Sequence, residues 1–223
     1  MSRAADLRLY LVTCRALGRG RPLVDLVRQA VEGGVTVVQL REKEASTRRF
    51  VALAEELQGL LVPLGVPLVI NDRIDVALAV GAAGVHVGQD DMEVATARRI
   101  LGGDRLLGVS VSTVEEARHA EADGADYLGV SPVYATPTKT DAPSPVGLRG
   151  LAAMRGATRL PLVAIGGLCA DNLSPVLEAG ADGIAVVSAI MAADDPGAAA
   201  RELRARIDRG GSLGSGSGSR KRL

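Results

Sequence analysis

The chain has 223 residues, of which 47% are hydrophobic and 23% are charged, proportions that are typical of a globular protein. Because 26 basic residues balance 26 acidic ones, the chain lacks the positive excess of a general nucleic-acid-binding protein. Aromatic residues make up only 2% of the chain, which argues against a surface on which bases or sugars stack.

The sequence predicts neither a membrane span nor a signal peptide. The longest charge-free stretch, 57–71, is interrupted by Pro63, Gly65 and Pro67, and it is too short to cross a bilayer. Two cysteines, Cys14 and Cys169, lie far apart in the chain and form no metal-binding spacing. This cysteine usage fits a reducing compartment, so we expect the protein in the cytoplasm, with no membrane partner.

Eight short apolar runs rich in Val, Ile and Leu recur along the chain. Each run is continuously apolar rather than alternating, which is typical of strands that are buried on both faces in a parallel sheet. The runs are 7–12, 35–40, 67–71, 84–88, 106–111, 127–133, 161–167 and 183–190.

Amphipathic stretches with helical spacing separate these predicted strands. In 21–34, for example, Leu23, Leu26, Val27 and Ala30 fall on one face of a helix. Glycines commonly follow the predicted helices, where they end a helix in the left-handed conformation. The same amphipathic pattern predicts helices over 46–61, 93–103, 113–124, 171–180 and 195–207.

The alternation of eight predicted strands with predicted helices indicates the α/β class and a single-domain TIM (β/α)8 barrel over 1–209. An open, doubly wound sheet is the competing architecture, but no Gly-x-Gly-x-x-Gly motif opens the first unit. The segment 210–223 is rich in Gly and Ser and ends in basic residues, so we expect a disordered tail.

Polar residues gather where the predicted strands end. In a TIM barrel these ends form one rim, and the rim carries the chemistry. Asp72 and Asp91 supply carboxylates from adjacent strands, and Arg41, Lys43 and Lys139 supply positive charge. Mg²⁺ takes one or two carboxylates and bridges phosphate oxygens. The rim therefore predicts Mg²⁺ as cofactor, bound together with a polyphosphate substrate.

A second anion site is predicted after the seventh and eighth strands. The seventh predicted strand ends in Gly166 and Gly167, and the eighth carries Ser188. Loops at these two places often bind a phosphate through backbone N–H groups. A diphosphate and a monophosphate bound at one rim would imply a condensation of two phosphorylated small molecules.

Each motif also has a purely structural interpretation. The charges at 41–43 could be solvated, and Asn71 with Asp72 could cap the following helix. The joint placement of the motifs favours the functional interpretation. His86 lies between valines inside a predicted strand, so we interpret it as a residue of the barrel interior. With no third partner, a Ser-His-Asp triad has no support.

Seven motifs, in order along the chain, closely resemble those of the thiamine-phosphate synthase family. The likeness runs from Leu9 to about Asp195. The family has a TIM-barrel fold and joins 4-amino-2-methyl-5-(diphosphooxymethyl)pyrimidine to 4-methyl-5-(2-phosphoethyl)thiazole, which releases diphosphate and gives thiamine phosphate. The seven motifs are 39–43, 71–72, 88–91, 108–110, 136–139, 165–167 and 187–188.

This resemblance implies a role for each motif. The reaction would begin with ionisation of the C–O bond, and the thiazole nitrogen would then capture the pyrimidine-methyl cation. Mg²⁺ would be held by Asp72 and Asp91, and catalysis would involve Lys139, Ser110 and Arg41. The pyrimidine diphosphate would be bound by Gln39, Leu40, Arg41, Glu42, Lys43, Asn71, Ser110 and Lys139. The thiazole phosphate would be bound by Thr136, Pro137, Thr138, Gly167, Val187 and Ser188.

Three other functions fit the same fold. A thiazole tautomerase relative lacks the Thr-x-Thr-Lys loop and the second metal carboxylate, which stand here at 136–139 and at Asp91. A phosphosugar isomerase or epimerase needs a base at a strand end, and Glu42 is the only such acid outside the metal pair. A non-catalytic phosphate-binding barrel would not require two carboxylates beside two lysines.

Overall fold

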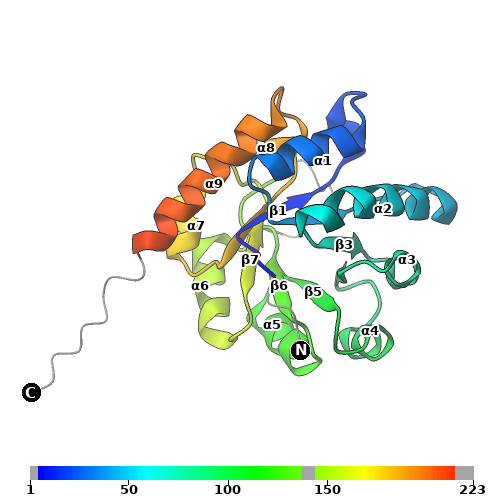
Figure 1. Ribbon diagram of the computed structural model, residues 1–223. Helices are drawn as coiled ribbons and strands as arrows, with labels where there is room; N and C mark the ends of the chain where they lie inside the picture. The colour runs from blue at the N-terminus through cyan, green and yellow to red at the C-terminus, as the bar shows by residue number, and fades with distance from the viewer. Residues whose placement is uncertain (1–4, 137–143, 214–223) are drawn as a thin grey trace, which may run out of the picture.

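The computed structural model describes residues 5–136 and 144–213. Eight parallel strands follow one another from β1 to β8 and close into a barrel, with the helices packed around its outside (Figure 1). The predicted (β/α)8 barrel is therefore confirmed. The strands are β1 (Leu9–Val12), β2 (Val37–Leu40), β3 (Leu68–Asn71), β4 (Gly84–Val87), β5 (Leu106–Val111), β6 (Tyr127–Val130), β7 (Leu162–Ile165) and β8 (Gly183–Val186).

At least one helix follows every strand. The buried residues of the first α-helix are the four predicted from the amphipathic pattern, Leu23, Leu26, Val27 and Ala30. The helices are η1 (Arg15–Gly18), α1 (Leu23–Glu32), α2 (Thr47–Leu61), η2 (Val62–Leu64), α3 (Ile74–Val80), α4 (Val94–Leu101), α5 (Val114–Ala122), α6 (Gly147–Ala157), α7 (Ser174–Glu178), α8 (Ser188–Met191) and α9 (Pro196–Leu213).

The last helix, α9, extends beyond the predicted end of the barrel. It packs against α1, α7 and α8 and continues to Leu213. The predicted boundary at residue 210 consequently falls inside this helix, and 214–223 lie outside the described residues. Within the described part of the chain, no helix is both long enough and apolar enough to cross a membrane.

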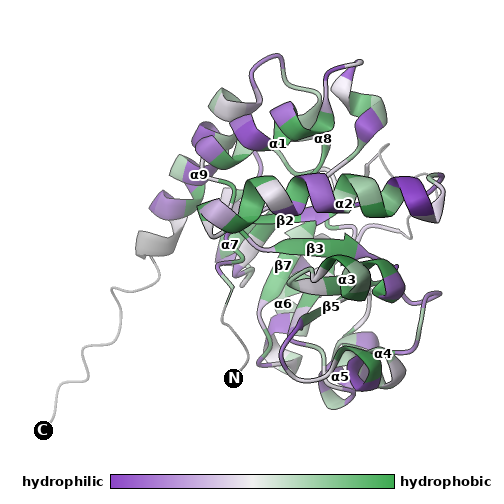
Figure 2. Cartoon of the chain, turned by 45° about the vertical axis from the view of Figure 1, so that its right-hand side comes forward, coloured by the Kyte–Doolittle hydropathy of each residue, from purple (hydrophilic) through white to green (hydrophobic). Residues whose placement is uncertain are grey.

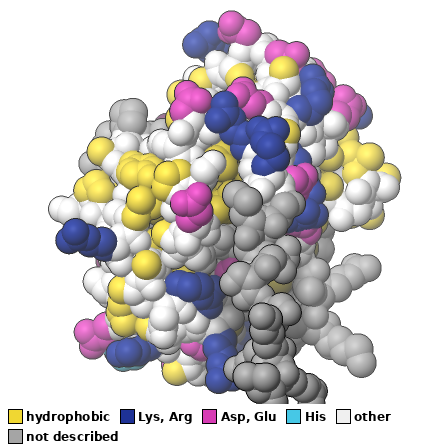
Figure 3. All heavy atoms as spheres, turned by 90° about the vertical axis from the view of Figure 1, so that its left-hand side faces the viewer, with side chains coloured by type: hydrophobic (Ala, Val, Ile, Leu, Met, Phe, Trp, Pro, Cys, Tyr) yellow, Lys and Arg dark blue, Asp and Glu magenta, His cyan; other side chains and the backbone are white. Residues whose placement is uncertain are grey.

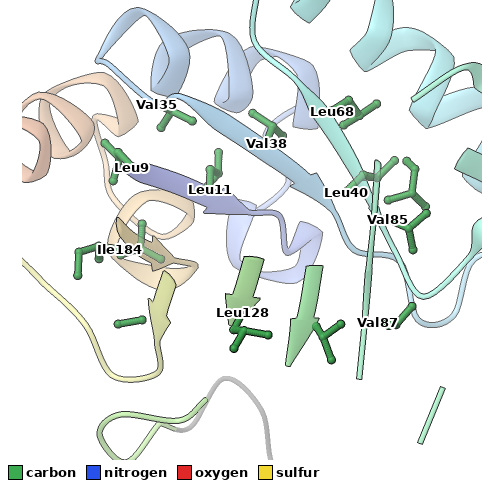
Figure 4. Packing of buried hydrophobic residues seen from close by; sticks show 14 of the residues in the cluster. Leu9, Leu11, Val35, Val38, Leu40, Leu68, Val85, Val87, Leu128 and Ile184 are labelled. Carbon is green, nitrogen blue, oxygen red and sulfur yellow. The ribbon is translucent and has the colours of Figure 1, made fainter. Parts of the chain in front are cut away.

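The strands separate two apolar layers. Side chains that point outward pack between the barrel and the helices, and they are almost all aliphatic, as Leu11, Leu40 and Val85 illustrate (Figure 4). The strands are mainly green, the colour of hydrophobic residues, in Figure 2. Inward-pointing residues form a smaller, separate cluster that includes Tyr10 and Tyr127. Because neither face meets bulk water, the strand sequences read as continuous apolar runs.

The outer surface carries both signs of charge. On the face drawn in Figure 3, basic and acidic side chains lie next to one another among apolar ones. Several are paired on the surface, as in Arg155 with Asp182 and Arg204 with Asp208. Such exposed pairs contribute little to stability, about 0–1 kcal/mol each.

Candidate active site

A cavity opens where the strands end at their carboxyl side. Its empty volume is about 1170 Å³, including open solvent at its mouth. It brings together residues that are far apart in the sequence, from Gln39 on β2 to Ser188 at the start of α8. The predicted site residues that line it are Gln39, Arg41, Lys43, Asn71, Asp72, Asp91, Ser110, Thr136, Gly167, Val187 and Ser188.

Two predicted substrate-binding residues have side chains that do not line the cavity. Leu40 is fully buried in the outer apolar layer, because it follows the inward-pointing Gln39 on the same strand. The Glu42 carboxylate accepts hydrogen bonds from the Arg15 guanidinium over 2.6–3.0 Å. Only their backbone groups remain available for the predicted role. Three further predicted residues, Pro137, Thr138 and Lys139, lie outside the described residues.

The two predicted metal ligands lie beside each other in the cavity, next to a lysine. The Lys43 ammonium is 3.2 Å from a carboxylate oxygen of Asp72. Asp91 accepts a 2.7 Å hydrogen bond from the backbone N–H of Gly88, which fixes one of its oxygens. Burial of the Asp72 carboxyl and the neighbouring Asp91 raise the pKa of Asp72, and Lys43 opposes this shift. The pair is therefore a site where a cation would relieve repulsion.

The backbone at Asp72 adopts an unusual conformation. Its φ angle is +63°, in the left-handed region that few residues other than Gly, Asn and Asp adopt. Its N–H donates a 2.8 Å hydrogen bond to the carbonyl of His86 on β4, which ties the turn to the neighbouring strand. This turn directly after β3 places the Asp72 carboxylate at the cavity.

The acidic pair fits Mg²⁺ better than a metal held entirely by protein ligands. In the described part of the chain, no three His, Cys, Asp or Glu side chains are grouped to hold a metal ion. Zn²⁺ sites use three or four such ligands. Mg²⁺ is bound by one or two carboxylates, and waters and substrate phosphates complete its shell. Asp72 and Asp91 match that pattern.

The loops after β6 and β7 are joined on the other side of the cavity. Val133 and Tyr134 donate backbone hydrogen bonds of 2.8 and 3.1 Å to the carbonyls of Ile165 and Gly166. Gly167 has a φ of +64°, and a Cβ atom on it would lie 2.6 Å from the carbonyl oxygen of Ala135. The close approach of the two loops therefore requires glycine at 167, beside Thr136 at the cavity wall.

The structure adds residues that the sequence motifs missed. Thr13 is buried, lines the cavity and accepts a 3.1 Å hydrogen bond from the backbone N–H of Arg41. Tyr10, His86 and Tyr127 also line the cavity from inside the barrel. The prediction that His86 belongs to the barrel interior is confirmed. Burial raises the pKa of both tyrosines, so they remain neutral.

Comparison with known proteins decides the family. The sequence matches the family of thiamine monophosphate synthase over residues 9–190. The chain belongs to this family. The resemblance inferred from the seven motifs is thus confirmed, and it extends over nearly all of the described barrel.

Individual relatives of this thiamine monophosphate synthase family match along almost their whole length. The thiamine-phosphate synthase of Chloroflexus aurantiacus is 58% identical over 202 residues, which cover 91% of this chain and 93% of the relative. That of Syntrophomonas wolfei is 56% identical over 200 residues, covering 90% and 96%. The solved structure of thiamine phosphate pyrophosphorylase from Pyrococcus furiosus superposes with a TM-score of 0.85 at 41% identity, covering 92% and 98%.

Proposed function

We propose that the chain is a thiamine-phosphate synthase, a transferase. It would join 4-amino-2-methyl-5-(diphosphooxymethyl)pyrimidine to 4-methyl-5-(2-phosphoethyl)thiazole and release diphosphate. The observation that carries this proposal is the pair Asp72 and Asp91 beside Lys43, in the cavity of a barrel 58% identical to a thiamine-phosphate synthase. These relatives support the synthase over the thiazole tautomerase.

The acidic pair and the nearby cations would bind the diphosphate end of the pyrimidine. Asp72 and Asp91 would hold Mg²⁺, which neutralises charge on the departing diphosphate. Lys43 and Arg41, which line the same cavity, would contact the remaining phosphate oxygens. Asn71, Gln39 and Ser110 would hold the pyrimidine, and Leu40 and Glu42 would contribute backbone groups only.

The proposed chemistry needs charge stabilisation more than proton transfer. The C–O bond to the diphosphate breaks first, and the diphosphate leaves with the electron pair. The lone pair of the thiazole nitrogen then forms the new bond to the pyrimidine-methyl cation. Arg41 would stabilise charge on the departing diphosphate, and Ser110 would contact the pyrimidine ring. We propose that Lys139 also stabilises the departing diphosphate.

The thiazole phosphate would bind on the opposite wall of the cavity. Gly167, Thr136, Val187 and Ser188 line the cavity there, and the Gly167 backbone would contact the phosphate. The neighbouring Pro137 and Thr138 would complete this contact. The catalytic unit would comprise residues 1–209, act on two phosphorylated small molecules in the cytoplasm and need no nucleic acid.

A turnover assay tests the proposal directly. Purified protein is incubated with both precursors and Mg²⁺, and diphosphate release and thiamine phosphate formation are followed together. We expect release only when both precursors are present, loss of release with EDTA and recovery on adding excess Mg²⁺. Release from the pyrimidine diphosphate alone would indicate hydrolysis. No release by folded protein would favour a tautomerase or a non-catalytic phosphate-binding barrel.

A further inference from the structure

A continuous chain of hydrogen bonds crosses the inside of the barrel. The Gln39 amide nitrogen donates to the Tyr10 hydroxyl over 3.0 Å, and that hydroxyl is 2.8 Å from the Tyr127 hydroxyl. The Tyr127 oxygen lies 3.1 Å from Nδ1 of His86, whose Nε2 lies 2.9 Å from the Ser110 hydroxyl. Both ends of the chain, Gln39 and Ser110, line the cavity.

The strands leave space for the two rings in the middle of this chain. A Cβ atom on Gly108 would lie 2.1 Å from Cζ of Tyr127 and 2.5 Å from Nδ1 of His86. A Cβ atom on Gly129 would lie 2.9 Å from Cε1 of the same histidine. Tyr127 and His86 thus occupy the positions that side chains on β5 and β6 would otherwise fill. The contact between Tyr127 and His86 therefore depends on glycine at positions 108 and 129.

The buried hydroxyls determine which way each hydrogen bond runs. Tyr10 and Tyr127 are 1% and 0% exposed, and a buried O–H needs an acceptor. Because Gln39 donates to Tyr10, the Tyr10 proton is left for the Tyr127 oxygen, and the Tyr127 proton for Nδ1 of His86. A neutral imidazole that accepts at Nδ1 carries its proton at Nε2.

The last hydrogen bond of this series is the one between His86 and Ser110. Nε2–H of His86 donates to the Ser110 oxygen, so the proton of that hydroxyl is not used in the bond with histidine. The opposite direction would give Tyr10 two incoming donors and leave its own buried proton without an acceptor. Such an unmade hydrogen bond is costly in a buried site.

We propose that Tyr127 and His86 are positioning residues that fix the Ser110 hydroxyl as a hydrogen-bond donor to an acceptor atom of the substrate. The proposal rests on the proposed function in one respect, namely that Ser110 contacts the pyrimidine diphosphate. Tyr127 and His86 act through Ser110. Tyr10 and Gln39 determine which group donates in each hydrogen bond of the series.

The first test measures the proton on His86 and needs no enzymatic activity. The chain has two histidines, so the full protein labelled with ¹⁵N-histidine gives two imidazole spectra, and a His119→Asn variant assigns them. In substrate-free protein at neutral pH we expect His86 to be neutral and protonated at Nε2. Protonation at Nδ1, or at both nitrogens, would overturn the proposed direction.

The second test is a double-mutant cycle between Tyr127→Phe and Ser110→Ala. In the parent chain, Tyr127→Phe should lower kcat/KM for the pyrimidine diphosphate about five-fold, the value of one ordinary hydrogen bond, with KM for the thiazole phosphate unchanged. In the Ser110→Ala background the same substitution should change kcat/KM less than about two-fold. The same loss in both backgrounds would overturn the positioning role.

Val37→Ala provides the matched control. Val37 is buried in the same inner cluster, and no side-chain hydrogen bond is available to valine. Its effect on kcat/KM should be the same factor with Ser110 and with Ala at that position. If the unsubstituted protein forms no thiamine phosphate at all, the proposed function fails, and the ¹⁵N measurement still decides whether the hydrogen-bond chain runs toward Ser110.

Discussion

The two faces of the barrel strands use different residues for different tasks. Outward, Leu11 and Leu107 pack against helices among other aliphatic side chains. Inward, on the same or neighbouring strands, Gln39, His86 and Ser110 form hydrogen bonds that end at the cavity. Successive side chains of a strand point to opposite faces, so one short segment can serve both purposes.

We therefore expect stability and activity to depend on opposite faces of the same strand. The outer layer removes apolar surface from water, which contributes roughly 25 cal/mol per Å². The inner face and the rim instead place charged and polar groups at fixed positions around a ligand. A substitution on one side should therefore affect mainly one property, and the following variants test that expectation.

The largest effect is expected at the rim. Asp91→Asn keeps the size of the side chain but removes one of the two carboxylates proposed to hold Mg²⁺. We expect kcat/KM to fall about 100- to 1000-fold, because charge on the departing diphosphate is then poorly stabilised. Steady-state kinetics at several Mg²⁺ concentrations would measure it.

The neighbouring Asp90 supplies the control for this variant. Asp90 is exposed and does not line the cavity, so Asp90→Asn should leave kcat/KM within about two-fold of the parent chain. Equal losses in the two variants would mean that net charge, and not a specific ligand, explains the effect.

The second effect concerns the outer layer. Leu107→Ala removes a fully buried side chain between β5 and the helices and should lower the free energy of unfolding by about 2–5 kcal/mol. Urea unfolding followed by circular dichroism would measure this loss. The kcat of the protein that remains folded should stay within about two-fold. A large loss of kcat with little loss of stability would contradict the separation of the two faces.

A third, smaller effect is the pH dependence of stability without metal. Burial and Asp91 raise the folded-state pKa of Asp72 above its unfolded value, so between these two values the folded protein binds more protons than the unfolded chain. The free energy of unfolding in EDTA should therefore rise as pH falls through the folded pKa toward the unfolded one.

Asp72→Asn isolates this contribution. Asparagine also adopts the left-handed backbone found at this position, so the substitution changes charge with little backbone strain. In EDTA at neutral pH the variant should be more stable than the parent chain. The difference should shrink as the pH is lowered from about 7 to about 4. A stability difference that does not change with pH would show that Asp72 does not titrate in this way.

The smallest effect is expected at Glu42. Its carboxylate pairs with Arg15 and lies outside the cavity, so Glu42→Gln should change kcat/KM by less than about three-fold. The same kinetic assay would measure it. A loss as large as that of Asp91→Asn would mean that the Glu42 side chain reaches the substrate after rearrangement.

The barrel and its rim were predictable from the sequence because their signals are local. Runs buried on both faces identified the strands, and the polar residues at their ends identified Asp72, Asp91 and Ser110 as neighbours. The acidic pair needed only the rule that parallel strands share one carboxyl edge. The tail boundary was less predictable, because α9 continues through Gly210 to Leu213 despite the glycines.

The chain of hydrogen bonds inside the barrel was not predictable, because Tyr10 and Tyr127 resemble ordinary core residues in an apolar strand. Their hydroxyls come within hydrogen-bonding distance only when the closed barrel brings together the inner faces of β1 and β6, which do not pair with each other. Leu40 and Glu42 show a different limit of sequence motifs, which do not distinguish side-chain contacts from backbone contacts. They are adjacent to functional residues in a motif, but strand alternation turns Leu40 outward, and the pairing with Arg15 draws the Glu42 carboxylate out of the cavity.

Closure of the ring between β1 and β8 has a consequence for synthesis of the chain. Leu9 on β1 pairs with Ile184 on β8, so the second edge of β1 has no hydrogen-bonding partner until β8 has been synthesised. Until then β1 and the newest strand both expose unpaired backbone groups, which favour association with other nascent chains. These two edges are therefore protected only once residues 183–186 have been synthesised and have paired with β1.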